Sequence, residues 1–296
     1  MSVTFKYYRS WEVKKFHGPL TRVFGAAIDV LKHGFSYTST KIFAALAFLV
    51  GPGAFLLLVP FLQSVGFGIG GDKIFAFKNF SYLIASSAFS TMPQLFVTFF
   101  MSNVLSDEFK NDAIQLYLAR PVYRSEYIFA RMLAGWLATF LILGLPAGIS
   151  NIVMMYAMNI EGEQAYTAMT FSLRIFTAVN LTLFIYLEII YIICAIVPRY
   201  KPGIISFAAL LMLSVMALVL GQVLDDANYT LLDPSTLVFY SLISEDLKNI
   251  PMLGMMFFAG ISIDAIFCFY ATLGVICGLF IALVMISWRA SGIWGK

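Results

Sequence analysis

Six long apolar runs constrain this chain more than any other feature of its sequence. A helix needs about 20 apolar residues to cross a hydrocarbon core about 30 Å thick, and it satisfies its own backbone hydrogen bonds there. Only 12% of the residues are charged, against about 25% in soluble domains. The sequence therefore predicts an all-α membrane protein with six transmembrane helices. The runs cover residues 42–65, 80–105, 127–158 (interrupted by Gly144 and Pro146), 171–197, 203–223 and 264–288.

A basic segment, residues 1–41, precedes the first run. It carries seven Lys or Arg residues against two acids, and it starts without the apolar core of a signal peptide, so we expect the N-terminus to stay in the cytoplasm. Pro19 suits the first position of a helix. A basic amphipathic helix beside a span is expected to lie in the cytoplasmic interface, where it acts either as a passive tether or as an elbow that transmits motion. Its apolar stripe consists of Leu20, Val23, Phe24, Ala27, Ile28 and Leu31.

The densest run of charge, residues 106–131, separates the second apolar run from the third. A charge at the bilayer centre costs about 2.5–3.5 kcal/mol or more, so we expect this segment to lie in water. Ser106 predicts the N-cap of a helix with acids in its first turn, Pro121 ends that helix, and Ser125 can cap the next. Two ordered helices beside the membrane would form a docking surface, and an ordinary solvated loop is the alternative. The charged residues are Asp107, Glu108, Lys110, Asp112, Arg120, Arg124, Glu126 and Arg131.

The distribution of Lys and Arg predicts how the chain is oriented. Six spans return the C-terminal tail, residues 289–296, to the cytoplasm. Fifteen of the nineteen basic residues then lie on the cytoplasmic side, and the positive-inside rule favours this arrangement. The four basic residues outside are Lys73, Lys78, Arg174 and Lys248. The acids outside are Asp72, Glu161, Glu163, Asp225, Asp226, Asp233, Glu245, Asp246 and Asp264.

The last external segment, residues 224–263, is too long for a turn and too apolar for a solvated loop. Asp233, Pro234 and Ser235 are typical of a helix start. The apolar residues that follow predict short helices that dip back into the outer leaflet, which is tolerated where protein buries their backbone. These residues are Leu237, Val238, Leu242, Met252, Leu253, Met255, Met256, Phe257 and Phe258.

The sequence contains no catalytic motif. Its two histidines, His17 and His33, both precede the first span, and neither HExxH, G-x-S-x-G nor GxxxxGK[ST] occurs. The three cysteines lie in apolar runs without metal-ligand spacing, and we interpret them as small buried hydrophobic residues. We therefore expect a chain that is not an enzyme and binds no metal or cofactor. Any ATP would be bound by another polypeptide.

Glu188, in the middle of the fourth span, is the strongest candidate for an intramembrane polar site. An ionisable group at that depth suggests a function, and a neutral or hydrogen-bonded side chain at a helix interface is the alternative. Gln94 and Asn151 complete this possible polar site with Glu188, and both of them and Asn103 are expected to form hydrogen bonds between helices. Arg174 lies near the outer end of the same span and can extend to the interface.

The charged segment and its setting resemble the type-2 family of ABC transporter permeases, the membrane subunits of ATP-driven exporters and related systems. Members carry, after the second span, a helix with a Glu, a Leu-rich turn, a Pro followed by Arg, and then the third span. This chain has that order and differs at Asp112-Ala113, where the family often has Gly-Thr. The matching residues are Glu108, Leu116, Leu118, Pro121 and Arg124. The basic helix, six spans, a Pro-Arg turn at residues 198–202 and a long segment before the sixth span extend the resemblance along the whole chain.

The resemblance implies a permease subunit in a prokaryotic plasma membrane that pairs with a second copy of itself or a similar chain. Two separate ATP-binding subunits, which also hold the Mg²⁺, would dock on the coupling segment, residues 106–126. The residues implied in coupling are Asp107, Glu108, Lys110, Asp112, Arg120, Pro121 and Arg124. The alternatives are an ion-coupled secondary transporter or channel that uses Glu188, and a membrane-embedded enzyme, which the absent motifs disfavour.

Overall fold

The computed structural model of this chain describes residues 19–64, 73–110, 124–197, 202–224, 226–248 and 261–293, and these contain helices and no strand. Five helical stretches within them are long and apolar enough to cross a membrane. A sixth is added when the bent pair α3 and α4 is counted as one span. The predicted all-α class is therefore confirmed, and the five or six long apolar helices are compatible with a membrane protein, for which we predicted six spans.

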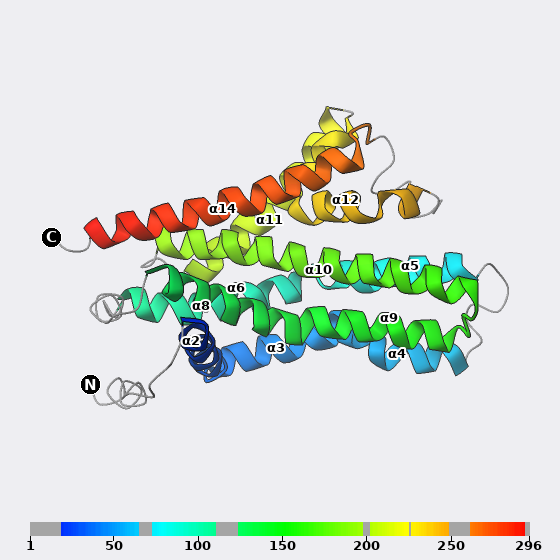
Figure 1. The fold of residues 1–296 in the computed structure, drawn as a ribbon, viewed down its shortest axis with the longest axis horizontal. Coiled ribbons are helices and arrows are strands. Elements are labelled where there is room, and N and C mark those ends of the chain that lie inside the picture. The colour runs from blue at the N-terminus through cyan, green and yellow to red at the C-terminus, as the bar shows by residue number, and fades with distance from the viewer. Residues whose placement is uncertain are drawn as a thin grey trace.

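Most helices lie side by side along the long axis of the molecule (Figure 1). In chain order they are α2 (Pro19–Gly34), α3 (Thr38–Val50), α4 (Pro52–Ser64), α5 (Lys73–Ser87), α6 (Thr91–Lys110), α8 (Arg124–Thr139), the π-helix η2 (Phe140–Gly144), α9 (Leu145–Ala157), α10 (Glu163–Ile196), α11 (Pro202–Val223), the 3₁₀ helix η3 (Ala227–Leu232), α12 (Pro234–Lys248) and α14 (Ala265–Ile293).

Helix α10 forms the centre of the bundle. It packs against α5 and α6 of the second span, α8 and α9 of the third, and α11, α12 and α14. Small residues bring the third span close to it, since a Cβ added at Gly135 would lie 3.1 Å from Leu187 and one at Gly148 would lie 2.9 Å from the Phe176 ring. These two contacts show that the third span and α10 run antiparallel.

The first three spans are each interrupted. Helices α3 and α4 meet at Gly51 and Pro52 with a bend of 50°, where the proline lacks the N–H that would continue the hydrogen-bond ladder. The π-helix η2 precedes Pro146 in the third span, and a proline is a common cause of such a local irregularity. The second span breaks at residues 88–90, between α5 and α6.

Helix α2 begins at Pro19, as predicted. It lies across the bundle: Figure 1 shows α2 end-on, whereas the other helices are seen from the side. Its Val23, Ala27 and Val30 are buried, and it packs against α8 and α6. We call the end of the bundle where α2 lies the α2 end. The outer side chains Leu20, Phe24 and Ile28 are exposed, as expected of a helix that lies in a membrane interface.

The structure corrects the helix boundaries predicted around the charged segment. Helix α6 continues without interruption through Ser106 to Lys110, so Ser106 does not start a new helix. Helix α8 begins at Arg124, so Ser125 lies inside its first turn. The apolar character of the second span carries the helix onward, which overrides the local N-cap signal. Arg131, which we expected in water, is only 2% exposed in α8.

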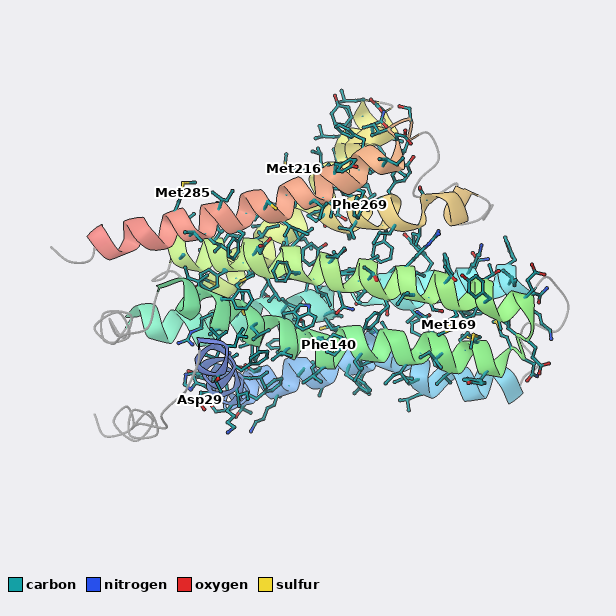
Figure 2. The ribbon with its side chains drawn as sticks, in the orientation of Figure 1. Asp29, Phe140, Met169, Met216, Phe269 and Met285 are labelled. Atoms are coloured by element: carbon teal, nitrogen blue, oxygen red, sulfur yellow. The ribbon has the colours of Figure 1, made fainter. Side chains whose placement is uncertain are left out.

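Helices α11 and α14 form the least buried part of the bundle. Within their membrane-length windows only 22% and 17% of the residues are buried, against 50–56% in the second, third and fourth spans. Met216 on α11 and Met285 on α14 project outward (Figure 2). Cys277 on α14 is also exposed, which corrects the prediction that all three cysteines are buried. These two helices therefore offer an apolar surface to lipid or to another subunit.

Candidate functional site

A cavity of about 960 Å³ lies between the second span, α10, α11, η3 and α12. Its polar lining includes Asp233, Tyr186, Ser214 and Gln94, and its apolar lining includes Phe89 and Leu218. Cavities of this size hold drug-sized ligands. The cavity is therefore the first candidate for a binding site in the described part of the chain.

Asp233 is the centre of the polar lining and is only 8% exposed. Its Oδ1 accepts a hydrogen bond of 2.8 Å from the Ser214 hydroxyl on α11. Its Oδ2 accepts a hydrogen bond from the Ser235 hydroxyl. The same oxygen accepts from the backbone N–H and from the hydroxyl of Thr236, and both of these distances are 3.3 Å. The Tyr186 hydroxyl on α10 also lies beside this carboxylate. Hydroxyl groups from α10, α11 and α12 thus converge on one acid.

Asp233 lies inside the bundle, nearer to the α2 end than to the opposite end. Tyr186 is about 15 Å along α10 from Ile196 and about 35 Å from Glu163, at 1.5 Å per residue. Ser214 likewise lies near the middle of α11. Because Asp233 bonds with Ser214 and lies beside Tyr186, it is well inside the bundle. A hydrocarbon core about 30 Å thick that begins at the α2 end would have its midplane near this carboxylate.

The position of Asp233 corrects our assignment of this residue to the external water. Asp226 caps η3 near the end of α11, where its N–H bonds with the Gly221 carbonyl. The chain then descends through η3 to Asp233 and returns toward the opposite end along α12, which packs on α10 and α14. The described residues 226–248 therefore have the form expected of a re-entrant segment, while Met252, Leu253, Met255, Met256, Phe257 and Phe258 lie outside the described residues.

The break in the second span borders the same cavity. Phe89, at the break, makes an edge-to-face contact with Tyr186, with ring centroids 5.9 Å apart. The hydroxyls of Ser86, Ser87 and Ser90 bond back to carbonyls in their own segment, and Gln94 Nε2 donates to the Phe89 carbonyl at 3.0 Å. The bond from Gln94 satisfies a carbonyl that the helix leaves free, because residue 93, four positions after Phe89, is a proline and has no N–H. Broken spans beside a polar site near the midplane recur in transporters.

The three residues of the predicted intramembrane site are not brought together. Gln94 lines the cavity, although its amide bonds within its own span rather than across to another helix. Asn151 lies on α9 beyond Gly148, and Gly148 packs at Phe176, so it is about 20 Å along the bundle from Glu188. The prediction for Asn103 is confirmed, since its amide donates to the hydroxyls of Ser39 and Thr40 on α3.

Glu188 is fully buried, but it does not line the cavity. It follows Tyr186 by two residues, so its side chain leaves α10 about 200° around the helix from the cavity wall. Neither carboxylate oxygen has a hydrogen-bond partner among the described residues, and the same is true of both amide atoms of Asn151. Glu188 and Asp233 are thus two buried acids at similar depth on different sides of α10.

The predicted coupling residues are only partly within the described structure. Asp107, Glu108 and Lys110 lie in the last turn of α6, and Arg124 begins α8. Asp112, Arg120 and Pro121 lie outside the described residues. The two helices that flank the coupling segment contact each other and α2.

Asp233 was not among the site residues predicted from the sequence. Asp-Pro-Ser was correctly predicted as a helix start, and α12 begins at Pro234. The additional signal was the apolar character of the segment around it, since an acid in an apolar external segment is a candidate for burial. What could not be read was which helices it meets.

Comparisons with known proteins identify no relative. No family model matches the chain, no curated protein matches it, and no solved structure matches it. Among the described residues no group of three or more His, Cys, Asp or Glu side chains could hold a metal ion. The function therefore has to be argued from the fold and the cavity alone.

Proposed function

We propose that this chain is the permease subunit of an ATP-driven transporter of the type-2 ABC class, with ATP hydrolysed by separate subunits that dock on residues 106–126. One observation supports the proposal. The first turn of α6 lines the cavity, and the same helix continues without interruption to Lys110 in the coupling segment. The distance from Thr91 to Lys110 is about 29 Å along the helix. A displacement of the coupling segment would therefore move a wall of the cavity.

Helix α2 extends this argument. An added Cβ at Gly34 would lie 2.5 Å from the Phe100 ring, so α2 and α6 meet without room for a side chain. Ala27 is fully buried where α2 packs on its neighbours, α8 and α6. Helix α2 and the two helices that flank the coupling segment, α6 and α8, would move as one packed unit, which favours the elbow over the passive tether.

The remaining parts of the proposal follow the same class of transporter. The α2 end faces the cytoplasm of a prokaryote, in agreement with the distribution of Lys and Arg. Two copies of this chain, or this chain and a similar one, enclose the transport path. The permease is an exporter, it holds no ATP or Mg²⁺ itself, and ATP binding in the partner subunits shifts the pair between inward-open and outward-open states.

A second candidate is an ion-coupled transporter or channel that uses Glu188. The observation that favours it is the fully buried carboxylate without a hydrogen-bond partner among the described residues. Such a group could take up and release a proton. The location of Glu188 away from the cavity weighs against this candidate, because a coupling ion must influence the cargo site.

ATP hydrolysis separates the two candidates. The chain is purified from its native membrane in mild detergent, and ATPase activity is measured before and after any co-purifying ATP-binding subunit is removed. We expect activity only in the complex, stimulated when the complex is placed in lipid. Rigorously purified chain that hydrolyses ATP alone, or that transports an ion without ATP, would refute the permease proposal.

A further inference from the structure

We infer that the cavity around Asp233 binds an amphipathic organic cation, with its ammonium group beside the Asp233 carboxylate and its hydrocarbon part directed out between α5 and α11. As the identity of the cargo, this inference rests on the proposed function. As a binding site, it is tested on the chain alone.

The charges of the lining favour a cation. Two acids, Asp226 and Asp233, line the cavity, and no Lys, Arg or His does so among the described residues. The donors that reach Asp233 are neutral hydroxyl groups and one backbone N–H. Neutral donors leave the net charge of an ionised carboxylate uncompensated, and in a low-dielectric environment an uncompensated charge strongly favours a counter-ion.

Aromatic rings beside the acid favour an organic cation over a metal ion. Phe89 contacts Tyr186 and Phe239 edge to face, with centroid distances of 5.9 and 5.6 Å, and Tyr82 contacts Phe239 in the same way at 5.9 Å. All four rings line the cavity. Aromatic faces attract alkylammonium groups within about 6 Å, whereas a small metal ion prefers several oxygen ligands.

The apolar part of the lining determines where the hydrocarbon lies. Asp233, Tyr186 and Gln94 are buried, whereas Leu83 on α5 and Leu211, Val215 and Leu218 on α11 are exposed as well as lining the cavity. The acid thus lies in the depth of the cavity. The outer part on the side of the bundle holds these four apolar side chains together with the exposed polar side chains Ser86, Thr91 and Gln222. A ligand with a cationic head and an alkyl tail matches both, and it could enter from the bilayer.

The test is direct binding of radiolabelled hexyltrimethylammonium to the purified full chain in lipid nanodiscs, with empty nanodiscs as the blank. We expect saturable binding that unlabelled hexyltrimethylammonium displaces and that hexanesulfonate, with the same tail and the opposite charge, does not. Asp233→Asn should weaken binding about tenfold or more. Asn is also a good N-cap, so α12 should remain folded.

The matched control is Glu163→Gln, an exposed acid outside the cavity, which should bind as the unmodified chain does. Val215→Trp, at an exposed position, should block the outer part and weaken binding of the hexyl compound more than that of tetramethylammonium. Equal displacement by hexanesulfonate, or unchanged affinity in Asp233→Asn, would overturn the inference. Neither result depends on an ATP-binding subunit, so the proposed function would still stand. Conversely, cation binding by a chain that never assembles with such a subunit would support this site and refute the proposed function.

Discussion

The α2 end of the bundle and the cavity inside it differ in the side chains that bring their helices together. At the α2 end, α2, α6 and α8 meet through small and apolar side chains such as Ala27, Gly34 and Val104. At the cavity, hydroxyls and an acid from three helices replace that packing, and the second span is broken. Close packing transmits displacement, because protein interiors have low compressibility. A cavity with polar groups can instead bind and release a ligand. Under the proposed function, the α2 end would receive the displacement of the docked ATP-binding subunits, and the cavity would change shape in response.

The largest expected effect concerns the side of the membrane on which each end of the bundle lies. In a chain with Cys194, Cys268 and Cys277 replaced by alanine, single cysteines are placed at Lys110 and at the exposed Glu161 between α9 and α10. An impermeant thiol reagent added to intact cells should label position 161 and not position 110. The expected difference is all or none, because the bilayer excludes the reagent. Labelling of position 110 from outside would show that the chain has the opposite orientation and that the coupling segment does not lie in the cytoplasm.

Charge reversal at the coupling segment should have the next largest effect. Glu108→Lys or Arg124→Glu would leave a partner group unpaired or opposed in a desolvated interface, which costs about 2–5 kcal/mol and weakens assembly about 30-fold or more. Assembly is measured by titrating the proposed ATP-binding subunit against this chain in nanodiscs. The control is Lys73→Glu at the opposite end, where Lys73 is exposed, and assembly should be unchanged. Normal assembly of both coupling-segment variants would show that the subunit docks elsewhere.

Overpacking under α2 should have a smaller effect that distinguishes an elbow from a tether. Ala27 is fully buried, so Ala27→Leu should cost about 1–3 kcal/mol of stability and lower the ATP-driven transport rate. The matched control is Ala26→Leu, one position around the helix and only partly buried, which should cost less. Thermal unfolding and transport are measured on the same preparations. Transport at the normal rate in a destabilised Ala27→Leu chain would show that α2 is only a tether.

The smallest effect is expected at Glu188, on the side of α10 away from the cavity. Glu188→Gln preserves the shape of the side chain and removes its titratable proton. If the cavity is the site of transport, ATP-driven transport should stay within about twofold of normal, a change worth less than 0.5 kcal/mol. Transport is measured in vesicles at several pH values. Loss of transport with intact folding and intact ATPase coupling would favour the ion-coupled candidate.

The spans and their helical class could be predicted from the sequence because the apolar runs are long and backbone hydrogen bonding in lipid leaves few alternatives. Pro19 and Pro234 also marked helix starts correctly, since proline fits the first turn. The N-cap signal at Ser106 failed because the preceding helix continues through it. Local preferences are weak beside the cooperative extension of an existing helix.

The candidate site could be predicted only in part. Glu188 stood out because it is the only charged residue between Arg174 and the end of α10. Which side of α10 faces the cavity is decided by tertiary packing. Asp233 was visible as a helix cap, but its burial depends on contacts with Ser214 on α11 and Tyr186 on α10. Such long-range convergence has no periodicity in the sequence, so it could not be read from local patterns.

Site-specific photo-crosslinking tests the central claim, that a separate ATP-binding subunit docks at the α2 end, most directly. A photoreactive amino acid replaces Lys110 in one version of the full chain and Lys73 in another, and each is illuminated in its native membrane. We expect a covalent adduct from position 110 with a polypeptide that carries the GxxxxGK[ST] phosphate-binding motif, identified by mass spectrometry, and none from position 73. An adduct with that subunit from position 73 only, or its absence from position 110 in a complex that hydrolyses ATP, would show that the subunit does not dock at the α2 end.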